Sequence, residues 1–217
     1  SRLLLSISLK LKKKCMKRVI YLSILGVLLL SCQTNNRYTI HGTVSNKAYE
    51  GTNVYMQQMT DDAMVITDTA HVINGAFSFS GMADTTVLRF IALDESIGAL
   101  EDTRVPVLIE PGRITIEFDS VATVRGTKGN NAYADLREQQ REINATLREV
   151  VERYNNARQA GTLTDTMETE VRDEYDRIHD QLVELNFDYA KKNMRNELGR
   201  HLFVTSYSMF TPEQQRE

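Results

Sequence analysis

The clearest structural signal in this sequence is the segment His71-Val72-Ile73-Asn74-Gly75-Ala76-Phe77-Ser78-Phe79. After Asn74-Gly75, apolar and polar side chains alternate, as in a strand that buries one face and exposes the other. Asn and Gly both tolerate a positive φ, which the central residues of a two-residue hairpin turn require. The stretch therefore predicts two short strands joined by a tight turn.

The same two-residue period extends over about 90 residues on either side of this turn. It predicts eight short strands, in residues 38–44, 54–59, 64–73, 76–79, 87–93, 105–110, 114–118 and, most weakly, 121–125. Pro111-Gly112 predicts a second tight connection between strands. Because no helical pattern interrupts the strands, we predict an antiparallel β-sandwich or a partly closed barrel in residues 37–128.

From residue 129 the apolar residues recur every three or four positions, as on one side of a helix. A first stripe comprises Tyr133, Leu136, Ile143, Leu147, Val150, Tyr154 and Ala157, and only Gln140 interrupts it. Asn130 or Asn131 is expected to cap this helix, and Gly161 to end it. A second stripe comprises Val171, Tyr175, Ile178, Leu182, Leu185 and Tyr189, after a cap-like Asp165-Thr166-Met167-Glu168. We therefore predict an α+β fold with an α-helical hairpin spacer in residues 129–210, including a shorter helix in 196–210.

The last residues carry a helix start signal. Thr211-Pro212-Glu213-Gln214 combines a capping Thr, a Pro at the first helical position and a Gln three residues after the Thr. The few residues that follow are too short to hold a helix. We expect residues 211–217 to be the start of a truncated further element, with a frayed polar tail as the alternative.

Charge is distributed unevenly along the chain. Seven of the 26 Lys and Arg residues lie in residues 1–31, whereas all 29 Asp and Glu residues follow residue 49, so residues 32–217 carry 19 basic and 29 acidic side chains, or −10. A body this acidic repels polyphosphate, which argues against nucleic-acid partners and against membrane binding by charge alone. Charged residues of the predicted helices, such as Arg137, Arg141 and Glu142, are expected to form a solvated face.

An export signal is predicted before residue 32. Met16-Lys17-Arg18 precedes an uncharged run, residues 19–30, which would span about 18 Å as a helix, short of the ~30 Å bilayer core. Leu29-Leu30-Ser31-Cys32 resembles a bacterial lipobox. That resemblance implies removal of residues 1–31, a diacylglyceryl thioether on Cys32, an acylated amino terminus, and a tether in residues 32–36. The alternative is an ordinary signal peptide that ends before a cysteine.

These features predict a protein of the cell envelope that a lipid anchors to a bacterial membrane. More than one acyl chain makes such an anchor stable. Residues 33–37 lack the acidic run that resembles a surface-export tag, so the body is expected to face the periplasm.

Residues with catalytic or ligand chemistry are not grouped in the sequence. Cys15 is lost with the leader and Cys32 is lipidated, so no disulfide, CxxC pair or thiolate metal site is expected. No metal-binding spacing relates the four histidines, His41, His71, His179 and His201. We expect solvent to surround the acidic pairs Asp61-Asp62, Asp94-Glu95 and Asp173-Glu174. A local hydrogen bond is expected within Asp68-Thr69. Gly42, Gly75, Gly81 and Gly112 are expected at turns or close contacts. We expect no catalytic residues, no cofactor and no metal, and therefore predict that this chain is not an enzyme.

Four motifs together resemble the family called domain of unknown function 4369. They are Tyr38-Thr39-Ile40-His41-Gly42-Thr43-Val44, residues 68–81 around Asn74-Gly75, Leu108-Ile109-Glu110-Pro111-Gly112-Arg113-Ile114-Thr115-Ile116, and residues 126–131. The resemblance covers residues 37–131, and the following helical segment is similar to the family's spacer. It implies a lipoprotein signal before the domain and, after the spacer, a thioredoxin-like domain of the AhpC/TSA or TlpA type, a thiol–disulfide oxidoreductase with a CxxC that this sequence does not contain.

Three hypotheses about function follow. The first is an envelope lipoprotein module, a non-catalytic spacer or recognition domain for a protein partner or for a downstream thioredoxin-like domain. The second is a stand-alone lipoprotein that binds a small ligand, peptide or glycan, although the absence of Trp weakens a sugar site. The third is an enzyme complete within residues 33–217. It has the least support of the three, because no nucleophile–base set is recognisable.

Overall fold

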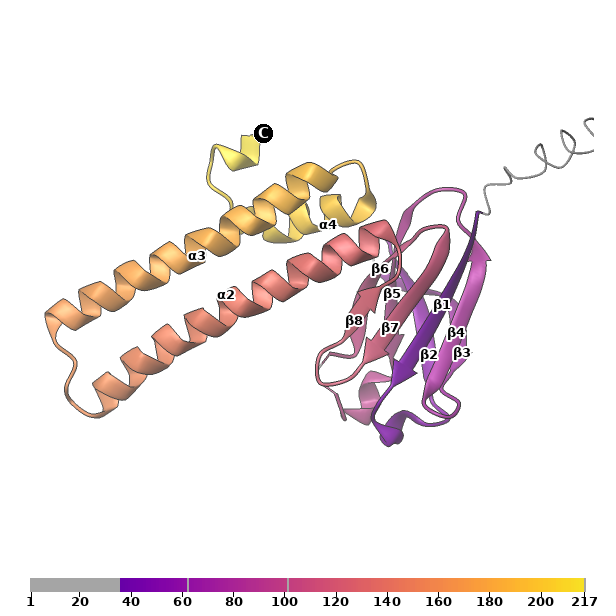
Figure 1. Ribbon diagram of the computed structural model, residues 1–217, viewed down its shortest axis with the longest axis horizontal. Coiled ribbons are helices and arrows are strands. Elements are labelled where there is room, and N and C mark those ends of the chain that lie inside the picture. Colours follow the sequence, from indigo (N-terminus) through magenta and orange to yellow (C-terminus); the bar gives the residue numbers. More distant parts are fainter. Residues whose placement is uncertain (1–35, 62, 101, 217) are drawn as a thin grey trace, which may run out of the picture. The chain divides into compact units, whose positions relative to one another are not determined.

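Two four-stranded β-sheets pack face to face in the computed structural model, which describes residues 36–61, 63–100 and 102–216 (Figure 1). The strands are β1 (Arg37–Val44), β2 (Asn53–Met59), β3 (Met64–His71), β4 (Ala76–Met82), β5 (Val87–Leu93), β6 (Arg104–Ile109), β7 (Gly112–Phe118) and β8 (Thr123–Arg125). Short 3₁₀ turns are formed by Lys47–Tyr49 and Glu95–Ile97. The predicted strands and the sandwich are thus confirmed, whereas the leader, Cys32 and tether residues 32–35 lie outside the described residues.

One strand pair departs from the antiparallel arrangement predicted for the sandwich. The sheets have the orders β4-β1-β7-β8 and β3-β2-β5-β6. Every pair is antiparallel except β1 and β7, which run parallel with Tyr38 opposite Gly112 and Val44 opposite Phe118. After Pro111 the chain crosses from one sheet to the other, so β7 enters beside β1 in the same direction.

The predicted Asn74-Gly75 turn forms, but it connects two sheets. Both residues have positive φ, 53° and 71°, and Ile73 and Ala76 exchange backbone hydrogen bonds of 2.8 and 3.1 Å. The Glu50 carboxylate accepts the N–H groups of Asn74 and Gly75 at 2.8 and 3.0 Å. Beyond this bridge β3 and β4 diverge, so the turn is a corner of the sandwich and not a two-stranded hairpin.

The core lies between the two sheets and consists of the inward-facing alternate residues. Ile40, Ile91, Val107, Ile114 and Ile116 are each fully buried. Burial of such side chains is the main favourable contribution to folding.

Two of the predicted close-contact glycines lie under aromatic rings in the β1–β4 pair. Gly42 lies opposite Phe77, and Gly81 opposite Tyr38. A side chain on Gly42 would overlap the Phe77 ring at 1.9 Å. The other two, Gly75 and Gly112, have positive φ values of 71° and 126°.

The predicted helical hairpin is confirmed and consists of α2 (Lys128–Gln159) and α3 (Asp165–Asn193), followed by α4 (Glu197–Ser206) (Figure 1). Gly161 is left-handed at the end of α2, as expected. Away from the sandwich, the hairpin has its own hydrophobic cluster, of which Leu147, Val150, Val171, Ile178 and Leu182 are the buried members. A 3₁₀ turn, Tyr207–Met209, follows α4.

The helix caps differ in detail from those predicted. The N-cap residues are Thr127, Thr164 and Asn196, and the Thr164 hydroxyl accepts the Met167 N–H at 3.2 Å. Neither Asn130 nor Asn131 caps α2, because both side chains bond to the sandwich instead.

Asn130 joins the first turn of α2 to the edge of β6. Its Oδ1 accepts the Leu108 N–H at 3.0 Å, and its Nδ2 donates to the Leu108 carbonyl oxygen at 2.8 Å. Nδ2 also donates to Oγ1 of Thr127 at 2.7 Å. Asn130 and Leu108 are fully buried, so this side chain supplies the hydrogen bonds that a neighbouring strand would make.

The C-terminal helix start signal makes both of its reciprocal hydrogen bonds. Oγ1 of Thr211 accepts the Gln214 N–H at 3.3 Å, and Oε1 of Gln214 accepts the Thr211 N–H at 3.0 Å. A 3₁₀ turn, Gln214–Arg216, follows. Within the described residues, no helix is both long and apolar enough to span a bilayer.

Candidate functional site

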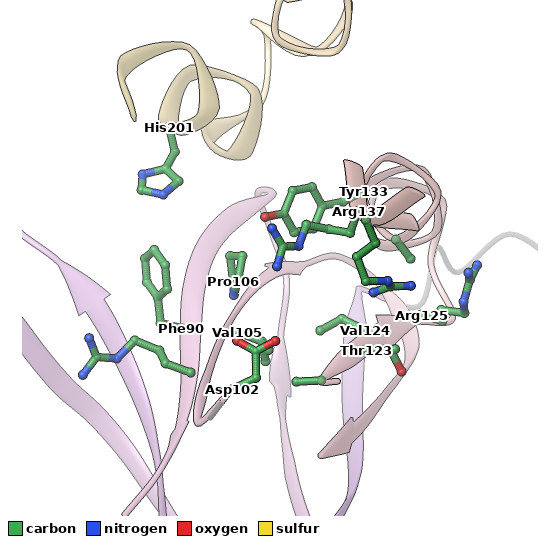
Figure 2. Close-up of a pocket in the computed structure, with 14 residues that line it drawn as sticks. Phe90, Asp102, Val105, Pro106, Thr123, Val124, Arg125, Tyr133, Arg137 and His201 are labelled. Carbon is green, nitrogen blue, oxygen red and sulfur yellow. The ribbon is translucent and has the colours of Figure 1, made fainter. Parts of the chain in front are cut away.

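A cleft of about 250 Å³ lies where the helices meet the sandwich. Its walls come from β5, β6, β8, α2 and α4 and comprise Phe90, Asp102, Arg104, Val105, Pro106, Ala122, Thr123, Val124, Arg125, Tyr133, Ala134, Arg137, Arg141 and His201. Figure 2 shows Tyr133 and Arg137 of α2 across from Asp102, with His201 over Phe90 at one end.

The packing of α4 on β5 builds that end of the cleft. The Asn196 side chain caps α4 by accepting the Gly199 N–H at 2.8 Å, and the Glu197 carboxylate accepts the Leu88 N–H. Leu198 is buried against the outer face of the sheet. This docking brings the His201 ring edge-to-face with Phe90, their centroids 5.5 Å apart.

Four arginines line the cleft, and they differ in their ion pairs. Arg104 pairs with Glu95 at 2.6 Å, and Arg125 pairs with Asp135 at 3.0 Å and Glu138 at 3.4 Å. In the described part of the chain neither Arg137 nor Arg141 pairs with a carboxylate, although Arg137 donates to Oε1 of Gln140 at 3.3 Å.

The ionisable groups of the cleft respond to its partial burial. Burial raises the pKa of the Tyr133 hydroxyl; the Arg137 charge opposes this shift and the Asp102 charge adds to it. Burial lowers the pKa of His201, which keeps the ring neutral at pH 7. The cleft therefore presents guanidinium donors, one carboxylate and neutral aromatic rings.

This arrangement is suited to binding. Arginine guanidinium groups hold carboxylates or phosphates through charge-assisted hydrogen bonds, and Phe90, Val105 and Pro106 are apolar residues of the lining. No three His, Cys, Asp or Glu side chains come together as a metal site among the residues that the structure describes.

Of the histidines singled out in the sequence, the structure brings only His201 to the cleft. His41 and His71 are exposed on strands, and His179 stacks on Tyr175 with an angle of 14° between the rings. His41 and His71 lie on strands of different sheets, and His179 and His201 lie on different helices.

Two of the acidic pairs make local structural contacts. Asp94 accepts the Ser96 hydroxyl at 2.6 Å and the Ser96 N–H at 3.0 Å, and these hydrogen bonds lower the pKa of Asp94. Glu174 pairs with Arg153, which joins α2 to α3. Asp68 accepts the Thr69 N–H at 2.8 Å, which is the local hydrogen bond predicted for this pair.

Arg137 is exposed, as predicted for a solvated face, and Arg141 is half-buried, and both also line the cleft, which was not predicted. Their sequence positions held a signal that could have located it. Tyr133, Arg137 and Arg141 are spaced by four residues, so they share one face of the helix. An aromatic residue on that face indicates the side that packs on the sandwich.

Comparison with known proteins gives one family match. Residues 38–133 match the model of the family described as Domain of unknown function (DUF4369). The match covers the sandwich and the start of α2, and ends before Arg137 and Arg141. No curated protein matches the chain.

Proposed function

Because residues 38–133 form a domain of the DUF4369 family, we propose that this chain is a non-catalytic, lipid-anchored module of the bacterial cell envelope. In it the sandwich and the helical hairpin act together as a spacer and recognition domain. The membrane is the first partner, through acylated Cys32, with the body facing the periplasm. A thioredoxin-like thiol–disulfide oxidoreductase domain is the second.

The observation that carries the spacer role is the buried junction between Asn130 and Leu108. It fixes α2 to the sandwich at a point where a flexible linker would let the two parts turn independently. At ~1.5 Å per residue, the 32 residues of α2 span about 48 Å. A junction of this kind holds what is attached to the helices at a set position relative to the sandwich.

The recognition role is supported by the cleft at that same junction. Its walls combine side chains from the DUF4369 domain, such as Phe90, with side chains from the spacer, such as Arg141. A ligand in this cleft would contact both parts at once.

Thiol chemistry has to come from the partner domain in this proposal. After Cys32 the sequence contains no cysteine, so residues 33–217 offer no thiolate nucleophile. The module would position or select the substrate, and the CxxC domain would reduce or oxidise it.

Metabolic labelling with radioactive palmitate tests the anchor. Wild-type protein and the Cys15→Ser variant, whose cysteine lies in the leader, should both carry label. Cys32→Ser should carry none. Equal labelling of Cys32→Ser, or an unlabelled wild-type protein, would contradict the proposal.

A stand-alone ligand-binding lipoprotein is the second candidate, and the cleft favours it because the cleft is complete within this chain. The intact mass of the protein extracted from envelopes separates the two candidates. A mass that includes a further domain with a CxxC supports the oxidoreductase module, and a mass that ends at Glu217 supports the stand-alone binder.

A further inference from the structure

We infer that the cleft between β6, β8 and α2 binds a monocarboxylate that carries an apolar group and an N–H donor, the chemistry of an N-acylated amino acid or a peptide C-terminus. The inference rests on the recognition role proposed above and names its ligand class. Arg137 and Arg141 would hold the carboxylate, and Phe90, Val105 and Pro106 would contact the apolar group.

Positive charge is concentrated on the wall of the cleft. Residues 32–217 carry a formal charge of −10, yet four arginines gather around this cleft. Arg104 and Arg125 are neutralised by their own carboxylates, whereas Arg137 and Arg141 have no acidic partner in the described part of the chain. Their spacing of four residues places the two guanidinium groups on one face of α2, where both can reach a single anion.

Apolar side chains lie beside these arginines. Phe90, Val105 and Pro106 line the cleft, and Tyr133 closes the wall from α2. An inorganic anion would contact only the arginines. An anion with an attached aromatic or aliphatic group would also contact these apolar side chains.

Asp102 limits the charge of the ligand. It lines the cleft across from Tyr133 and Arg137 (Figure 2). A phosphate dianion would be repelled by it. A monocarboxylate with a neighbouring N–H can use Arg137 and Arg141 for the anion and Asp102 as acceptor for the N–H.

Size supports a small ligand. At about 250 Å³ the cleft lies below the ~300–1,000 Å³ of common drug-sized sites. One amino-acid residue therefore suits it better than a sugar chain or a folded partner.

Calorimetric titration of the full chain with three probes tests the inference. N-acetyl-L-phenylalanine should bind, while N-acetyl-L-phenylalaninamide, which lacks the carboxylate, and acetate, which lacks the apolar group, should each bind at least about tenfold more weakly. Equal binding of the amide or of acetate, or no binding of N-acetyl-L-phenylalanine, would overturn the inference.

Arginine variants locate the binding site. The double variant Arg137→Gln/Arg141→Gln should lose at least about tenfold in affinity for N-acetyl-L-phenylalanine. The matched control is Arg148→Gln, an exposed arginine of α2 outside the cleft, which should stay within about twofold of wild type. Unchanged thermal unfolding of each variant separates a lost contact from a lost fold. An equal loss in Arg148→Gln would show non-specific attraction and contradict the site.

A peptide arm distinguishes the two sources of this chemistry. If the natural ligand is a peptide C-terminus, N-acetyl-Gly-Gly-Phe with a free carboxylate should bind at least as tightly as N-acetyl-L-phenylalanine, and its C-terminal amide should not. Weaker binding of the tripeptide assigns the site to a free N-acyl amino acid. The proposed function and the ligand inference can be contradicted independently. An unacylated Cys32 would contradict the proposed lipid anchor and would not change the result of these titrations.

Discussion

Nε2 of Gln140 on α2 donates a hydrogen bond of 2.6 Å to Oδ1 of Asn186 on α3. Both side chains are buried, within a helix interface that is otherwise mostly apolar. Arg137 donates to Oε1 of the same Gln140, so this buried amide connects the cleft arginine to the hairpin interface. Gln140 is thus the position that interrupts the first apolar stripe, and its partner explains why a polar side chain is tolerated there.

Removing one member of this pair should cost more than removing both. Gln140→Leu leaves the Asn186 amide buried without its partner, which should lower the free energy of unfolding by about 1–3 kcal/mol. The double variant Gln140→Leu/Asn186→Leu should recover most of that loss. Urea unfolding followed by circular dichroism measures all three. A double variant no more stable than Gln140→Leu alone would contradict the pairing. The exposed Gln139→Leu is the control and should change the stability little.

The Asn130 junction should be among the most sensitive polar positions of the chain. Asn130→Ala orphans the buried N–H and C=O of Leu108 and should cost about 2–4 kcal/mol. Asn131→Ala, whose side chain accepts the exposed Gly126 N–H at 2.8 Å, is the control and should cost less than about 1 kcal/mol. Thermal unfolding compares the two, and equal losses would argue against Asn130 as the coupling residue.

Gly42 should not accept a side chain. In Gly42→Ala the new methyl group would overlap the Phe77 ring, so the buried ring must move, at a cost of about 1–3 kcal/mol. Phe77→Leu replaces the ring with a smaller side chain. The double variant Gly42→Ala/Phe77→Leu should therefore lose less free energy of unfolding than the sum of the two single variants. Strict additivity in chemical unfolding would show that the ring does not rest on Gly42.

Stability should depend on pH through His201. Burial lowers the pKa of His201 below its usual value of about 6.5, so the unfolded chain binds the proton more tightly. The contribution of the neutral ring is therefore complete above about pH 6.5 and is lost as the pH falls below it. The melting temperature of wild type should drop more between pH 7.5 and 5.5 than that of His201→Gln. The exposed His71→Gln should follow wild type, and a wild-type-like drop in His201→Gln would rule out this histidine as the source.

The strands and helices could be predicted because their buried residues recur with a fixed period. Ile114 and Ile116 face the core and Thr115 between them does not, because successive side chains of a strand point to opposite faces. The period carries no strand direction, so the parallel pairing of β1 with β7 could not be seen in it. Chain directions follow from the crossing at Pro111, which is a tertiary feature.

The candidate site was harder to predict than the fold, because the sequence position of each of its residues fits two different structural roles. An Asn near a helix start can bond to the helix or to a strand edge, and only the packing of α2 on β6 assigns Asn130 to the second role. Arg137 and Arg141 have the spacing of an exposed helix face. They become part of a cleft only because β6 and β8 lie against that face.

Mass spectrometry of the protein extracted from cell envelopes tests whether a lipid anchors the chain at Cys32. We expect a mature N-terminus at Cys32 that carries a diacylglyceryl group on sulfur and an acyl chain on its amino group. A chain that retains residues 1–31, or that begins at an unmodified Cys32 in the soluble fraction, would contradict it.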